Sequence, residues 1–230
     1  MSTLTFKKPI EETEDHWISV SDLMSGLMIV FLFIAVAYMY NMQKMVKPYA
    51  QTKQAIYDAL YTEFKDDLTK KDWSASIDPK TLMITFNAPD IQFATNKTEL
   101  KAKYQGVLQD FFPRYLKVLM TYKDDINEVR VEGHTDSKWF DAKSDTDAYF
   151  KNMALSQGRS RSVLEYVYSL DTVSIYKHWM KQNIAAVGFS SSKIITNREG
   201  HENKEASRRV SFRVITNAEK YIDTVLGVKK

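Results

Sequence analysis

Asp22 is the side chain whose chemistry conflicts most with its surroundings, because it is the one charged residue between Trp17 and Gln43. A carboxylate at membrane depth costs at least ~2.5–3.5 kcal/mol, so such residues are functional candidates by default. Burial raises a carboxyl pKa, which lets the group bind and release a proton near neutral pH. The small polar Ser21 and Ser25 beside it favour close helix packing rather than contact with lipid. We therefore expect Asp22 to transfer ions in steps.

Asp136 and Arg159 form the second candidate pair. They lie in the segments VRVEGHTDS (129–137) and NMALSQGRSRSV (152–163). The first predicts a strand that ends in a glycine turn, which places Asp136 on a loop at the end of a sheet. The second predicts an early helical turn with Arg159 on the same side as Leu155. A carboxylate and a guanidinium held close together could bind the ammonium and the carboxylate of a zwitterion.

Each candidate site has a structural alternative. Asp22 could be an interfacial residue that reaches the lipid headgroups, or a charge near a helix N-terminus that the helix dipole favours. Asp136 and Arg159 could simply form a structural ion pair with each other, which the spacing alone slightly favours.

The apolar segment around Asp22 is long enough to cross a membrane. It runs from Trp17 to Tyr40, and about 24 residues at ~1.5 Å each give roughly 36 Å of helix for a ~30 Å hydrocarbon core. Trp17, Tyr38 and Tyr40 suit the aromatic belts of the two interfaces. The mean hydropathy of the whole chain, −0.38, conceals this segment.

Two alternatives to a permanent membrane helix are a cleaved signal peptide and a buried helix of a globular domain. Ala35-Val36-Ala37 has the pattern of a cleavage site, but the segment 11–17 is acidic where a signal peptide is basic. A buried globular helix is disfavoured because a small domain rarely needs an apolar run this long. The flanking lysines do not place the N-terminus inside and lean weakly the other way; they are Lys7, Lys8, Lys44, Lys47 and Lys53.

The rest of the chain predicts a linker helix followed by a mixed α+β domain. Apolar residues recur every four positions over about 50–70, which is typical of an amphipathic helix. Strand patterns then alternate with helical ones, a succession typical of a small α/β sandwich. The expected strands lie near 82–86, 129–133, 185–188 and 210–214, and the expected helices near 97–122, 147–169 and 173–182, with a kink or break at Pro113.

Composition excludes several classes of protein. The 230 residues include no Cys, which removes thiolate metal sites, cysteine nucleophiles and disulfides. The net charge of +3 argues against a dedicated nucleic-acid binder, and the Arg208-Arg209 pair is interpreted as solvated surface. The four His show no metal-ligand spacing, and we expect His134 to be a hydrogen-bonding residue of a loop. Phosphate-loop, nucleophile-elbow and hydrolase signatures are lacking, which predicts a protein that is not an enzyme and uses no cofactor.

The membrane segment resembles the single transmembrane helix of stator B subunits, the MotB-like proteins of ion-driven motors. Those helices carry one essential Asp near the cytoplasmic end, followed by an apolar residue, Met, and Ser or Thr. This resemblance implies that Asp22 translocates ions and that Ser21 and Ser25 line the channel or pack beside it. The matching positions in WISVSDLMSGLMIVFLFIAVAYMY are Asp22, Leu23, Met24, Ser25 and Met28.

Residues from about 75 to 216 resemble the OmpA-like peptidoglycan-binding domain. The resemblance rests on GHTD, on the LS-x-x-R run and on the late SRRV. In that family the Asp of the first motif and the Arg of the second bind the diaminopimelate side chain of the wall peptide, which implies these roles for Asp136 and Arg159. Matching residues that the resemblance implies shape or line the pocket are Thr135, Asn152, Leu155, Ser156 and Arg209.

Two segments depart from the pattern of that family. The stretch 137–151 is longer and more acidic than is usual, and 190–204 lacks the usual Pro. Together the resemblances imply an inner-membrane protein with a cytoplasmic N-terminus and a periplasmic C-terminal domain. The implied divisions are a cytoplasmic segment 1–16, a transmembrane helix 17–42, a periplasmic linker helix 43–72, the OmpA-like domain 73–216 and a tail 217–230.

The short linker and the run SDLMSGLMIVFLFIAVAYM are most similar to the B subunits of Zorya anti-phage defence systems. This implies a homodimer inside a pentamer of a polytopic A subunit, protons passing through Asp22, and rotation conveyed to cytosolic defence effectors without direct nucleic-acid contact. The lack of an oxygen-ligand cage on the helix favours H⁺ over Na⁺. A flagellar-type stator B subunit, or a purely structural peptidoglycan anchor without ion flow, are the alternatives.

Overall fold

The computed structural model describes residues 14–69, 73–87 and 89–217. The chain divides into two compact units, Met1–Pro48 and Tyr49–Lys230. The predicted cytoplasmic segment 1–16 and tail 217–230 fall almost wholly outside the described residues.

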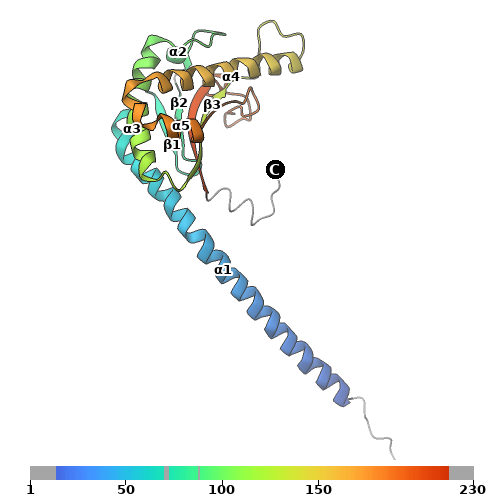
Figure 1. Cartoon of the computed structure of the whole chain (residues 1–230). Coiled ribbons are helices and arrows are strands. Elements are labelled where there is room, and N and C mark those ends of the chain that lie inside the picture. The colour runs from blue at the N-terminus through green and yellow to red at the C-terminus, as the bar shows by residue number, and fades with distance from the viewer. Residues whose placement is uncertain (1–13, 70–72, 88, 218–230) are drawn as a thin grey trace, which may run out of the picture. The chain divides into compact units, whose positions relative to one another are not determined.

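Helix α1 (Glu14–Leu68) contains the predicted membrane span (Figure 1). Its part from Val20 to Gln43 is long and apolar enough to cross a membrane, and none of it is buried within the chain. A continuous helix pairs its own backbone groups, which is the condition for a single segment to cross lipid. The helix continues without a break through the boundary expected between a transmembrane helix 17–42 and a linker helix 43–72.

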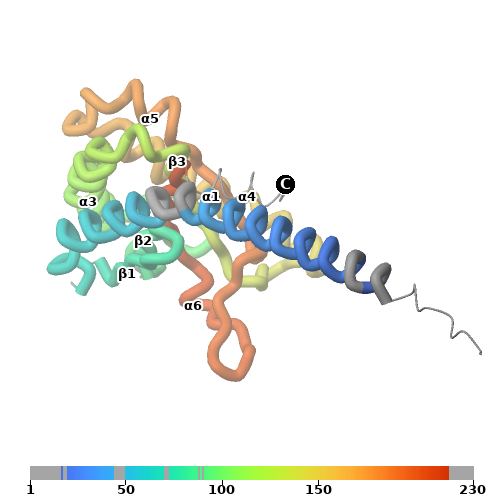
Figure 2. Tube along the Cα trace, turned by 90° about the horizontal axis from the view of Figure 1, so that it is seen from below, coloured from blue at the N-terminus to red at the C-terminus, as the bar shows by residue number. Residues whose placement is uncertain are grey.

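A five-stranded sheet forms the centre of the second unit, in the order β1-β2-β5-β3-β4. Figure 2 labels β1, β2 and β3 of this sheet. Strands β3 and β4 are parallel, and all other neighbours are antiparallel. The four predicted strands correspond to β2, β3, β4 and β5, whereas β1 is an edge strand that the sequence did not indicate. The bounds are β1 (Ala75–Asp78), β2 (Met83–Phe86), β3 (Ile126–His134), β4 (Ile184–Gly188) and β5 (Arg209–Thr216).

Helices cover one face of this sheet and produce the predicted two-layer sandwich. Val129 and Val131 of β3 and Phe212 of β5 are completely buried in the core on that face. The residues that alternate with them along the strands point to the opposite face of the sheet and are polar. On that face Thr85 and Ser211 share a hydrogen bond of 3.0 Å. The helices are α2 (Pro89–Gln92), α3 (Ala102–Thr121), α4 (Asp145–Ser169), η1 (Asp171–Tyr176), α5 (Lys177–Asn183) and α6 (Lys204–Ser207).

The last turns of α1 belong to the second unit. Ile56, Leu60 and Phe64 recur every four residues and are completely buried in its core. On the exposed side, Arg114 of α3 donates from Nε to Glu63 Oε1 at 2.7 Å. The amphipathic pattern predicted over 50–70 is therefore a part of the core rather than a free connection.

Pro113 does not break α3, so the break that was the stronger form of this expectation is wrong. The helix runs through it from Ala102 to Thr121. A proline removes one intrahelical hydrogen bond. Burial of the neighbouring Phe111, Phe112 and Tyr115 outweighs that loss, because the three rings pack together and against the core.

Gly133 and Gly188 lie opposite each other on β3 and β4 and allow α4 to approach the sheet closely. A Cβ at Gly133 would lie 2.3 Å from the carbonyl oxygen of Ser156, and one at Gly188 would lie 2.4 Å from the backbone nitrogen of Gln157. The predicted glycine turn is wrong, since β3 continues through Gly133 to His134. The glycines instead fix the distance between α4 and the end of β3, where the candidate loop begins.

Candidate functional site

Asp22 is exposed on α1, within the membrane-length segment. Ser25, one helical turn further on, donates a hydrogen bond from Oγ to the carbonyl oxygen of Ser21 at 2.8 Å. The three predicted residues therefore form a small polar surface on an apolar helix. Ser21, Asp22 and Ser25 are all exposed, so this surface is not covered by the described residues of the same chain.

The second candidate site is a cavity of about 290 Å³ between the loop after β3, α4 and the segment around α2. The sequence-predicted residues that line it come from two consecutive elements, the loop after β3 and helix α4. They are Thr135, Asp136, Asn152, Leu155 and Arg159, and they meet Phe93, Ala94, Asn96, Lys138 and Arg208 there.

The Asp136 carboxylate is held by two partners at this cavity. Its Oδ1 accepts a hydrogen bond from the backbone N–H of Lys138 at 3.0 Å, and its Oδ2 accepts one from Arg208 Nη1 at 2.9 Å. The Asp136 side chain is 13% exposed and that of Arg208 40%, so the ion pair faces solvent at the rim of the cavity. Sequence reasoning did not assign Arg208 to the site.

Arg159 reaches the same cavity from α4 and is fixed by backbone carbonyls. Its Nε donates to the carbonyl oxygen of Lys97 at 3.0 Å and its Nη2 to that of Ala94 at 3.3 Å. The guanidinium carbon lies 4.9 Å from the centre of the Phe93 ring. Burial, and then the positive charge of Arg208, lower the pKa of Arg159 to about 10, so the group is still protonated at neutral pH.

Asp136 and Arg159 face one cavity, and the ion pair that Asp136 makes in the described part of the chain is with Arg208. The direct structural pair that the spacing favoured is thus not formed. The cavity thus presents the Asp136 carboxylate, which is paired with Arg208, and the separate guanidinium of Arg159, which backbone carbonyls already hold in one orientation. This arrangement can bind a ligand that carries both a cationic and an anionic group.

Asn152 and Thr135 hold the loop after β3. Asn152 Nδ2 donates to the carbonyl oxygens of Asp136 at 3.1 Å and Lys138 at 3.2 Å. The backbone N–H of Thr135 donates to the carbonyl oxygen of Ser190 at 3.0 Å. These bonds position the loop that carries the carboxylate, while Leu155 supplies apolar lining.

The sequence also placed Ser156 and Arg209 at the pocket. Both are buried, but neither lines the cavity. Ser156 Oγ accepts the backbone N–H of Ser190 at 3.0 Å, at the close contact between α4 and the sheet. Both terminal nitrogens of Arg209 donate to the carbonyl oxygen of Lys193 at 3.2 Å, and burial lowers the pKa of Arg209. They support the segments around the cavity.

His134 lies at the end of β3 and is 3% exposed. Its ring stacks on Phe189 with 5.2 Å between the ring centres, and its Nε2 lies 3.5 Å from Glu132 Oε2. Burial lowers the pKa of His134, although Glu132 opposes the shift. His134 is the last residue of β3, so the expectation that it lies in the loop is wrong, while its Nε2 faces the Glu132 carboxylate.

A Zorya protein ZorB from Escherichia coli strain Crooks is 46% identical to this chain over 223 residues, which is 94% of each protein. The chain belongs to the ZorB family. Residues 92–208 also match the OmpA family, a range that contains Asp136, Arg159 and Arg208 but stops before Arg209.

The fold agrees with this assignment. The solved structure of a MotB-like protein from Desulfovibrio vulgaris matches with a TM-score of 0.52 at 20% identity, and the match covers 75% of this chain and 99% of that one. The predicted combination of an apolar helix with an OmpA-like domain is confirmed.

Proposed function

We propose that this protein is the B subunit of an ion-driven rotary motor in the inner membrane, and that the motor serves an anti-phage defence system. The observation that carries the proposal is Asp22, the one charged residue within the membrane-length helix of a chain from the ZorB family. A homodimer inside a pentamer of a polytopic A subunit would supply the helices that close the ion path around it.

Ion transfer follows from the chemistry of the carboxyl. When helices of the A subunit surround Asp22, its carboxyl is the group of this helix segment that can bind and release an ion. Alternate neutralisation and ionisation change the contacts that the helix makes, and repeated cycles turn the pentamer about the dimer. Rotation then reaches cytosolic effectors, while this chain itself stays away from nucleic acid.

Anchoring is the role of the second unit. Arg159, already oriented by two carbonyl oxygens, binds the carboxylate of the diaminopimelate side chain, and Asp136 accepts its ammonium. Because the guanidinium is fixed in advance, little side-chain entropy is lost on binding. A wall-binding pocket must lie outside the inner membrane, which puts the N-terminus in the cytoplasm and Asp22 near the cytoplasmic face.

Phage protection tests the motor. Cells that carry the complete defence system with Asp22→Asn are expected to lose protection, while the protein still inserts in the membrane and still binds the wall. Asp22→Glu keeps a titratable carboxyl and serves as the matched control, with at least partial protection. Full protection by Asp22→Asn would contradict the motor and would support the alternative of a purely structural peptidoglycan anchor.

Sedimentation with purified peptidoglycan tests the anchor. Arg159→Ala removes the oriented guanidinium and Asp136→Asn the negative charge, and each is expected to weaken co-sedimentation of the full-length protein at least about tenfold, in line with loss of a charge-assisted contact. Lys117→Ala, an exposed position on α3, is the control. Unchanged binding by both pocket variants would exclude this site.

A further inference from the structure

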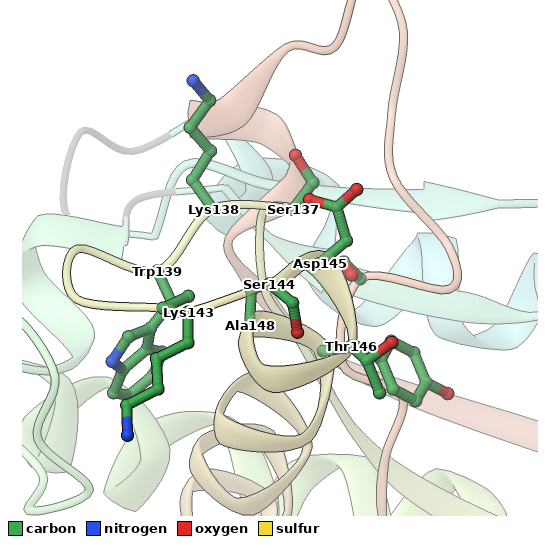
Figure 3. A pocket seen from close by; sticks show the side chains of 11 residues that line it. Ser137, Lys138, Trp139, Lys143, Ser144, Asp145, Thr146 and Ala148 are labelled. Atoms are coloured by element: carbon green, nitrogen blue, oxygen red, sulfur yellow. The ribbon is translucent and has the colours of Figure 1, made fainter.

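A second, larger cavity of about 770 Å³ lies beside the Asp136–Arg159 site (Figure 3). It is formed by the segment 137–149, the stretch that is longer than is usual in OmpA-like domains, together with Ser191. Lys138 lines both cavities, so they are neighbours. The role assigned to Asp136 and Arg159 makes no use of this space.

The segment around the cavity is held in place by its own hydrogen bonds. At its base, the backbone N–H and Oγ of Ser137 both donate to the Glu202 carboxylate, at 2.9 and 2.6 Å. At its other end, Ser144 Oγ accepts a hydrogen bond from the backbone N–H of Asp147. The Asp147 carboxylate in turn accepts a hydrogen bond from the backbone N–H of Lys143 at 2.9 Å. The loop is therefore built to keep one shape.

Most of the acidic character noted in the sequence is neutralised by Lys151 rather than presented to the cavity. Lys151 Nζ lies 3.2 Å from a carboxylate oxygen of Asp141 and 3.2 Å from one of Asp147. The pKa of Asp141 is lowered, chiefly by its hydrogen bond from Lys151. These pairs use two of the three acids of the segment, and Asp145 is the one that lines the cavity.

The lining has the chemistry of a carbohydrate site. Trp139 and Tyr149 supply aromatic surface, and hydroxyl groups come from Ser137, Ser144 and Thr146. Figure 3 shows Trp139 and Lys143 on one side of the start of α4 and Thr146 on the other. Aromatic rings can cover the apolar face of a sugar ring, and hydroxyl groups can pair with its polar edge.

We propose that this cavity binds an N-acetylated amino sugar of the glycan strand, with Trp139 as its principal contact. The inference rests on the proposed wall binding, because the sugar is joined to the peptide whose diaminopimelate side chain occupies the neighbouring pocket. A glycan contact beside a peptide contact fixes the orientation of the domain on the wall as well as its attachment. Such a constraint suits an anchor that has to resist torque.

Binding of two probes to the full-length protein in detergent tests the inference. The probes are a disaccharide–tripeptide that ends in diaminopimelate and the same tripeptide without sugar. Wild-type protein is expected to bind the first about tenfold more tightly, an effect within the range of a desolvated aromatic contact. Trp139→Ala is expected to remove this difference and leave tripeptide binding unchanged.

Phe140→Ala is the matched control, because Phe140 is 100% exposed, adjacent in sequence and not among the residues that line the cavity. It is expected to preserve the affinity for both probes, and Trp139→Phe to preserve most of the difference between them. Equal binding of the two probes by wild-type protein, or an unaltered difference in Trp139→Ala, would overturn the inference. Failure of wild-type protein to bind either probe would instead refute the wall site, and this inference with it.

Discussion

The apolar, membrane-length segment of α1 and the Asp136–Arg159 pocket differ in how much of each candidate site one chain provides. In the segment Val20–Gln43 the side chains are exposed, including Asp22. In the second unit, Asp136 and Arg159 are already held by Lys138, Arg208 and backbone carbonyls of the same chain. The side chains of the pocket are therefore held by contacts within a single chain, whereas Asp22 is exposed on its helix.

Truncation of a Phe in each region tests this difference most strongly. Phe64→Ala empties a position that is completely buried in the second unit and is expected to lower its free energy of unfolding by about 3–5 kcal/mol. Phe33→Ala removes the same atoms from a side chain that is 68% exposed, with no effect on unfolding of that unit. Urea unfolding of the full-length protein in detergent, followed by circular dichroism, measures both. Similar losses would show that the membrane segment contributes to the same core.

A methyl group added to Gly133, where α4 packs closely on β3, has the next largest effect on stability. Gly133→Ala would place a Cβ 2.3 Å from the carbonyl oxygen of Ser156, and forcing α4 away from the sheet is expected to cost about 1–3 kcal/mol and to weaken wall binding. Gly106→Ala is the control, because nothing lies within 4 Å of its Cβ and alanine favours the helix by about 0.5–1 kcal/mol. Urea unfolding compares the two variants. Tolerance of alanine at Gly133 would show that the pocket is not fixed by this contact.

The pH dependence of stability gives a smaller effect. Because burial lowers the pKa of His134 in the folded protein, the unfolded chain binds the proton first, and stability is lost as pH falls below the ordinary value of about 6.5. His134→Phe keeps a ring against Phe189 and is expected to flatten the decrease between pH 7 and 5. The exposed His201→Gln should not change it. An unchanged slope in His134→Phe would assign the pH dependence to other groups.

Strong local patterns predicted most of the fold. Two-residue alternation located β2, β3, β4 and β5, and the four-residue spacing of Ile56, Leu60 and Phe64 located the end of α1. Strand β1 was missed because it is a four-residue edge strand with no fully buried side chain. Pro113 was misread because the packing of its aromatic neighbours, which a local rule does not include, stabilises the helix.

The pocket was predicted in part for a similar reason. The motifs brought Asp136, Asn152 and Arg159 to one cavity, but they also selected Arg209 in place of Arg208. Adjacent residues at the start of a strand point in opposite directions. An assignment that is wrong by one position therefore selects a residue of the protein interior instead of one at the rim of the pocket. Where β5 begins depends on its pairing with β3 and on the segment around Lys193, which the sequence alone does not show.

Proton uptake tests the central claim most directly. Vesicles that contain the full-length protein together with its A subunit are compared for wild type, Asp22→Asn and Asp22→Glu, with an imposed proton gradient and an internal pH indicator. The account predicts that Asp22→Asn reduces flux to the level of empty vesicles, that Asp22→Glu retains part of it, and that both variants sediment with peptidoglycan like the wild type. Proton flux by Asp22→Asn at the wild-type rate would contradict the account.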